Sequence, residues 1–213
     1  ELAAWIPITY HVDADAAGAG TGRSWTDAFT DLQAALAAKA EAFADVRKIG
    51  RTHLQDAVPM TLGDEFSGYA RQIELAHERF SDIENRLAEL ALGGTAVGSG
   101  LNTHPEFAGR VIAELNARCG LKFREAANHF QAQASVDTAV ELSGALKTMA
   151  VALVKIANDL RWLSSGPRCG LGEINLPSLQ PGSSIMPGKV NPVIPEAVIQ
   201  AAAQVIGNDT VIS

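Results

Sequence analysis

Two long stretches of the chain repeat apolar side chains at alternating intervals of four and three residues, which places them on one face of a helix. The stretches cover 61–90 and 136–163. Some thirty residues at a rise of about 1.5 Å make a bundle helix about 45 Å long, and we expect the two helices to pack side by side. The apolar positions are Leu62, Phe66, Tyr69, Ile73, Ala76, Phe80, Ile83, Leu87 and Leu90 in the first stretch, and Leu142, Leu146, Met149, Leu153, Ile156, Leu160 and Leu163 in the second.

Shorter helices are predicted around these two. Ser-Trp-Thr-Asp at 24–27 suits a helix entry, and the helix is expected to run to about Val46, with Gly50 as its stop. A second begins after Thr103 and runs to about Ala117, and His104 is interpreted as a helix-start residue rather than a ligand. The glycine-rich stretch 93–100 lacks the spacing of a dinucleotide site and predicts a close turn between helices.

Residues 1–31 differ from the rest of the chain in their residue pattern. A short run of alternating apolar and polar residues is followed there by several glycines. This pattern predicts a β-like or irregular segment and a boundary near residue 31. At the other end, 193–206 is apolar on nearly every side, and Val140, Val151 and Val154 lie off the main stripe of their helix. Such faces need cover from other helices, so a homo-oligomer is expected.

Composition adds the fold class. Apolar residues make up 47% of the 213 residues but aromatic residues only 6%, which favours an all-α fold of closely packed helices. The net charge of −7 argues against nucleic acid or an anionic membrane as partner. Cys119 and Cys169 are too few for a disulfide framework or zinc site and predict buried or incidental thiols in the cytoplasm. Without a signal peptide or a long apolar run, a soluble protein is expected.

The loop before the last helix concentrates candidate chemistry. It reads Gly-Ser-Ser-Ile-Met-Pro-Gly-Lys-Val-Asn-Pro at 182–192 and contains no acid. Ser183 and Ser184 offer hydroxyls, Lys189 a cation and Asn191 an amide, and the glycines let backbone amides face a ligand. This combination suits a carboxylate, although each of these side chains taken alone is typical of an ordinary surface turn.

A second polar segment, 50–60, separates two predicted helices. His53 can exchange a proton near neutral pH, and Thr52 places a hydroxyl beside it. Glu196 suits the first turn of the last helix, where its carboxylate could also orient and charge an imidazole. Taken alone, His53 is more typical of a surface or core histidine than of a catalytic one. Metal-ligand spacings and a Ser–His–Asp signature are not found in the sequence.

Three motifs together resemble the fumarase/aspartase superfamily and, within it, the class II fumarase family. They are Gly-Arg-Thr-His-Leu-Gln-Asp-Ala at 50–57, the glycine-rich stretch extended to Pro105, and the loop at 182–192. The resemblance covers roughly 34–213. Histidine at 53 and glycine at 188 favour fumarase over aspartase. The resemblance implies a long-helix bundle that forms a homotetramer, in which each active site takes loops from three subunits.

The resemblance also implies an activity, which is metal-independent, cofactor-free and reversible hydration of fumarate to (S)-malate in the tricarboxylic acid cycle. Ser183 would be the base that removes a proton from malate, and His53, supported by Glu196, would handle the water. The groups implied to hold the dicarboxylate substrate are Thr52, Ser184, Lys189, Val190 and Asn191.

The chain also departs from that family. The Ser-Gly-Thr, Ser-Ser-x-Ser-Asn-Asp and His-Pro-Asn-Asp segments and the C-terminal domain have no counterpart, and 1–31 looks like the opening of a surface β-helix protein. We therefore expect a fused or truncated chain, with 32–213 as a partial central helical domain and with impaired activity in isolation. Two alternatives stay open, a non-catalytic oligomerisation module derived from the family and an aspartase-like ammonia lyase.

Overall fold

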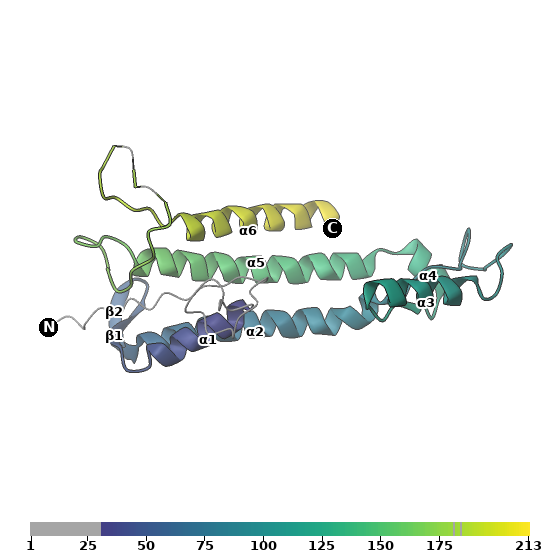
Figure 1. Cartoon of the computed structure of the whole chain (residues 1–213), viewed down its shortest axis with the longest axis horizontal. Helices are drawn as coiled ribbons and strands as arrows, with labels where there is room; N and C mark the ends of the chain where they lie inside the picture. The colour runs from purple at the N-terminus through teal and green to yellow at the C-terminus, as the bar shows by residue number, and fades with distance from the viewer. Residues whose placement is uncertain (1–30, 181, 184) are drawn as a thin grey trace. The chain divides into compact units, whose positions relative to one another are not determined.

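The structure, a computed structural model, describes residues 31–180, 182–183 and 185–213 (Figure 1). The chain divides into two compact units. Unit 1 contains the described residues up to Ala76 together with Met149–Gln204, and unit 2 contains His77–Thr148 and Val205–Ser213. Three helices run from one unit into the other, α2 (Leu62–Leu87), α5 (Asp137–Leu163) and α6 (Val193–Ile212). These are the helices that the sequence predicts at 61–90, 136–163 and 193–206, and the all-α class is confirmed.

Unit 1 begins with α1 (Leu32–Ala42). Asp31 caps the helix, since its side chain accepts a hydrogen bond of 3.1 Å from the backbone N–H of Ala34. The helix ends before the predicted Val46, because a turn closed by a hydrogen bond from the Val46 amide to the Phe43 carbonyl redirects the chain. Gly50 is therefore not its stop. The predicted entry at 24–27 lies outside the described residues.

A β-hairpin follows α1, where the sequence predicts only a polar connection. Strand β1 (Arg47–Thr52) pairs antiparallel with β2 (Gln55–Thr61). The pairing shifts register near Gly50, where a Cβ atom would lie only 2.9 Å from the carbonyl oxygen of Val58. The segment escaped prediction because its strands have no apolar alternation and are stabilised by pairing with each other.

The core of unit 1 is formed by α1, α2 and α5, which lie side by side in Figure 1. Tyr69 and Ile73 are its largest fully buried side chains. Phe66 makes edge-to-face contacts with both Phe43 and Tyr69, each with 5.4 Å between ring centroids. The predicted packing of the two long helices is thus confirmed in this unit. The buried core residues are Leu36, Leu62, Phe66, Tyr69, Ala70, Ile73, Ile156 and Leu163.

Unit 2 adds two short helices, α3 (Phe107–Cys119) and α4 (His129–Ala134), to the ends of the long ones. Strands β3 (Glu89–Leu90) and β4 (Arg124–Glu125) form a small parallel pair. Helix α3 starts later than predicted, and His104 serves its entry, since the ring Nδ1 accepts a hydrogen bond from the Glu106 amide.

The glycine-rich stretch is a close turn, as predicted. A Cβ atom on Gly98 would lie 2.6 Å from the backbone nitrogen of Phe130, and one on Gly93 would lie 2.8 Å from the Cβ of Ala108. Only glycine permits these approaches to α3 and α4.

Elsewhere in unit 2, Asp209 of α6 is buried and meets α5. It accepts a hydrogen bond of 2.7 Å from Ser143 and forms an ion pair with Lys147.

Two further findings concern composition. Cys119 and Cys169 are free and exposed, so the expectation of buried thiols is wrong and that of incidental ones remains. Within the described part of the chain, no helix combines the length and apolar character needed to cross a bilayer.

Candidate active site

The tip of the hairpin in unit 1 presents the first candidate residues. His53 and Leu54 form a two-residue turn with φ of 54° and 60°, closed by the pair of Thr52 and Gln55. Positive φ at both central residues is typical of a type I′ turn, which usually takes Asn and Gly. Thr52 and His53 are exposed. A strained, exposed histidine on a hairpin tip is well placed to meet a ligand.

Below the tip, two cations of β1 lie against one carboxylate of the segment that follows α5. Nη2 of Arg51 is 2.6 Å from Oε1 of Glu173, and Nζ of Lys48 is 3.0 Å from Oε2. Lys48 is also paired with Glu65 of α2. The Lys48 side chain is only 8% exposed, so these charges are largely shielded from solvent.

The electrostatics of this cluster keep it ionised. Burial by itself would raise the pKa of Glu173, but the interactions with Arg51 and Lys48 outweigh it and hold the pKa below the ordinary 4.5. The hydrogen bond with Glu173 raises the pKa of Arg51 in turn. The Glu173 carboxylate is therefore a fixed negative charge at the base of the hairpin.

The second candidate segment, 182–192, is a tight loop. Residues 186–189 form a β-turn in which the Lys189 amide donates to the Met186 carbonyl at 3.2 Å. Pro187 and Gly188, the latter at φ 79°, occupy the positions that a type II turn prefers for proline and glycine. A Cβ atom on Gly182 would lie 2.6 Å from the Lys189 carbonyl oxygen, so the two ends of the loop touch.

This geometry corrects one expectation about the loop. The sequence predicts that backbone amides of the loop face a ligand, but three of them are used within the loop. The Ser183 amide donates to the Lys189 carbonyl at 3.0 Å, the Ile185 amide donates to the Ser183 hydroxyl at 3.2 Å, and the Lys189 amide is used in the turn. These three amides are therefore already occupied by partners within the loop. Lys189, Val190 and Asn191 are exposed, Ser183 is half-buried, and Ser184 lies outside the described residues.

Glu196 lies in the first turn of α6, as predicted. Its Oε1 is 3.7 Å from Nη2 of Arg161 on α5. Among the described residues, no hydrogen bond or ion pair joins His53 to Ser183, Lys189 or Glu196. A single chain therefore displays the predicted residues in separate groups, His53 with Thr52, Ser183 with Lys189, and Glu196 with Arg161.

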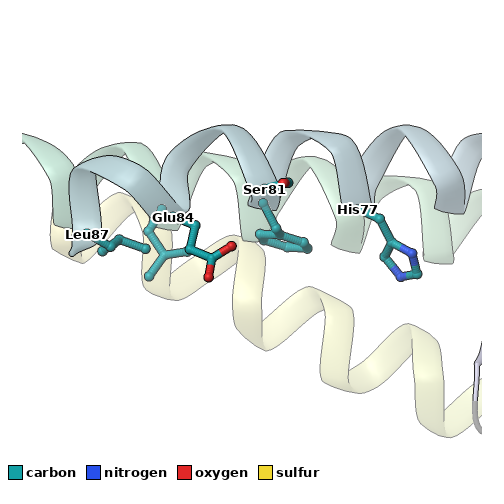
Figure 2. A pocket seen from close by; sticks show the side chains of 6 residues that line it. His77, Ser81, Glu84 and Leu87 are labelled. Carbon is teal, nitrogen blue, oxygen red and sulfur yellow. The ribbon is translucent and has the colours of Figure 1, made fainter. Parts of the chain in front are cut away.

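A hollow in the surface lies away from these residues. It has a volume of about 440 Å³, belongs to unit 2 and is lined by His77, Phe80, Ser81, Glu84, Leu87 and Leu142. Figure 2 shows the labelled side chains along one side of α2. None of the predicted site residues lines it.

Sequence reasoning missed Lys48, Arg51 and Glu173. The available signal was a pair of basic residues flanking Gly50, although nothing local pointed to the distant glutamate.

Comparison with known protein families shows to which family this chain belongs. The model of a family described as Lyase matches residues 23–207, most of the chain. This chain belongs to that lyase family.

Relatives of this lyase agree with the assignment. Fumarate hydratase class II of Mycobacterium tuberculosis is 64% identical over 187 residues, which are 87% of this chain and 40% of the relative. The protein of the same description from Neisseria meningitidis serogroup A is 55% identical over 207 residues, 97% of this chain and 44% of the relative. The lyase chain thus spans less than half the length of these relatives.

Solved structures show the same fold. A fumarate lyase:delta crystallin from Brucella melitensis bound to cobalt superposes with a TM-score of 0.79 at 51% identity, over 85% of this chain and 39% of the other. A class II fumarase from Schistosoma mansoni superposes with a TM-score of 0.78 at 43% identity, over 84% and 40%. At these identities the helical arrangement is that of the fumarate lyases.

Proposed function

We propose that this lyase is part of a fumarate hydratase, an enzyme that adds water reversibly to fumarate to give (S)-malate. The observation on which the proposal rests is the 64% identity to fumarate hydratase class II over 187 residues. The family match at 23–207 includes both candidate segments. The exposed Thr52–His53 turn and the loop with Ser183 and Lys189 support it, because they display a proton-transfer group, hydroxyls and a cation.

The roles follow from the chemistry of malate. Ser183, as the base, removes a proton from C3, and the electron pair of the broken C–H bond moves into the adjoining carboxylate. Lys189 stabilises the resulting aci-carboxylate. The C2–O bond then breaks, and the hydroxyl leaves as water with a proton from His53. Thr52, Ser184, Val190 and Asn191 hold the substrate carboxylates.

The reaction so written is a hydro-lyase step that needs neither metal nor cofactor. Glu196 supports the charged form of His53. Because the described ion pair of Glu196 is with Arg161, we propose that the His53–Glu196 pairing forms between chains.

We propose a homo-oligomer, with four chains as the family implies, as the assembled form. Exposed apolar side chains on the long helices support it, since α6 exposes 54% of Ile194 and 87% of Val211, and α5 exposes 55% of Val151. A cytoplasmic location, a place in the tricarboxylic acid cycle and a boundary at residue 31 remain predictions. Light scattering measures the assembly; a monomer at assay concentration would contradict it.

Loss of fumarate absorbance tests the activity. The purified chain is assayed alone and after mixing with a fragment of the Mycobacterium tuberculosis relative that covers the remainder of its length. We expect little turnover alone and restored turnover in the mixture. Ser183→Ala and His53→Ala should each abolish the restored turnover, whereas Ser178→Ala, an exposed serine in the preceding segment, should not.

The alternatives give different results. A non-catalytic oligomerisation module would assemble without turnover in any mixture. An aspartase-like enzyme would release ammonia from aspartate, and histidine at 53 disfavours it.

A further inference from the structure

Glu173 connects two parts of unit 1 that are far apart in sequence. Its carboxylate forms ion pairs with two residues of β1. Oε1 lies 2.6 Å from Nη2 of Arg51, and Oε2 lies 3.0 Å from Nζ of Lys48. Glu173 is 18% exposed and Arg51 19%, so the pair is shielded from water much more than an ordinary surface ion pair.

The backbone around Glu173 is firmly held. Its amide donates to the Leu163 carbonyl at the end of α5 at 2.8 Å, and the Gly172 amide donates to the Ser165 carbonyl at 2.9 Å. Gly170 packs so tightly that a Cβ atom on it would lie 2.3 Å from the Ser165 carbonyl oxygen. Ile174, the next residue, packs against the core. The carboxylate is therefore presented from a rigid support.

The hairpin, in contrast, needs outside support. Most of β2 is exposed, and its tip has two consecutive non-glycine residues at positive φ. Such conformations persist only where the surroundings determine them. Arg51 adjoins Thr52 and lies two residues before His53. Its contact with Glu173 therefore restrains the strand residue next to the pair of Thr52 and Gln55 that closes the turn.

We propose that Glu173 is a positioning residue for His53, acting through Arg51 and Lys48 to hold the hairpin tip in one conformation. The proposal rests on the proposed function in that it assigns His53 a role in binding or proton transfer. Glu173 also precedes Ser183 along the same chain, so one carboxylate joins the hairpin to the start of the segment that leads into the second loop.

Amide hydrogen exchange and the NMR signals of the His53 imidazole test this in the intact chain. Glu173→Gln keeps the shape of the side chain but removes its charge. We expect the ladder amides of β1 and β2 to exchange about tenfold faster or more, while amides around Tyr69 in α2 keep their rates. The His53 ring signals should shift or broaden. Glu74→Gln, which removes a carboxylate from the exposed pair with Arg71, should leave both readouts unchanged.

A double-mutant cycle adds a decisive comparison. Arg51→Gln should reproduce most of the effect of Glu173→Gln, which also removes the contact with Lys48. The double variant should add little to Glu173→Gln, because both changes remove the Arg51–Glu173 contact. Should Glu173→Gln prevent folding, Arg51→Lys retains a cation, loses the fork geometry and is expected to loosen the ladder partially. An unchanged hairpin in a folded Glu173→Gln or Arg51→Lys chain, or additive effects in the cycle, would overturn the proposal. The fumarate assay of the mixed fragments is a separate measurement. If the mixture shows no turnover while the hairpin of the Glu173→Gln chain loosens, the proposed function alone is refuted.

Discussion

Arg161 of α5 faces Glu196 of α6, with 3.7 Å between Nη2 of the arginine and Oε1 of the glutamate. The carboxylate proposed to support His53 is thus paired with an arginine within its own chain. Nη1 of Arg161 also donates to Asn158 at 3.0 Å, which fixes the guanidinium on the surface of α5. Glu196 therefore has a defined location before any second chain is present.

Replacing Arg161 by Gln should change stability little. Both side chains are about 40% exposed, and ion pairs of such exposure contribute about 0–1 kcal/mol. We expect the free energy of unfolding in urea to fall by no more than about 1 kcal/mol. Arg86→Gln, which breaks the somewhat more exposed pair with Glu141, is the comparison. A loss well beyond that of Arg86→Gln would show that Arg161 holds α6 in place.

Tyr69→Phe should be clearly destabilising. The hydroxyl lies 3.0 Å from Oε1 of Glu65 and 3.1 Å from Oδ2 of Asp159, and with one proton it donates to one of them at a time. Removing it takes one hydrogen-bond donor away from the half-buried carboxylates of Glu65 and Asp159, at a cost of about 1–3 kcal/mol measured by urea unfolding. Ile73→Val, a loss of one methylene from the same core, provides a packing control. An unchanged free energy of unfolding would contradict the contact.

The buried hydroxyl of Tyr69 also predicts that the folded chain loses stability at alkaline pH. Burial, with the charges of Glu65 and Asp159, raises the pKa of Tyr69 far above its ordinary 10.0. The unfolded chain therefore loses this proton first, and stability should fall as pH rises above about 10. Tyr69→Phe should reduce that fall. Tyrosinate absorbance followed through alkaline unfolding checks it; ionisation of Tyr69 in the folded chain near its ordinary value would refute the prediction.

Lys39→Met should stabilise the chain at neutral pH. Burial lowers the pKa of Lys39 to about 8, so the folded state disfavours its proton. Between that value and the ordinary 10.5 the unfolded chain binds more protons, and stability rises with pH across this window. The variant should be more stable at pH 7 and lack that rise. Lys155→Met, which breaks the pair with Asp159, should instead destabilise.

Leu54→Gly should raise stability, because glycine adopts positive φ without the Cβ penalty. The penalty for leucine at φ 60° is about 1–2 kcal/mol, and the added freedom of glycine in the unfolded chain offsets part of it. We expect a net gain of about 0.5–1 kcal/mol in thermal unfolding. Val58→Gly, an exposed residue in strand conformation on the same hairpin, should destabilise. A loss of stability from Leu54→Gly would argue against the type I′ turn.

The amino-acid sequence by itself determined the long helices and the chemistry offered by the loops. Leu62, Phe66 and Tyr69 recur at the helical period, and that signal is local, so α2 could be placed before any packing was known. The residue types at 182–192 likewise predict a turn that suits a carboxylate, and its turn at Pro187 and Gly188 agrees.

Only the tertiary structure decided how the distant groups meet. The hairpin at 47–61 has no alternation of apolar and polar residues that would predict its strands. They are stabilised by hydrogen bonds to each other, which a local sequence pattern does not reveal. Arg51 meets Glu173, and Glu196 meets Arg161, through the packing of α5 against its neighbours. Such pairs depend on the register and rotation of packed elements, which no local pattern encodes, and they decide where the charged groups of the candidate site lie.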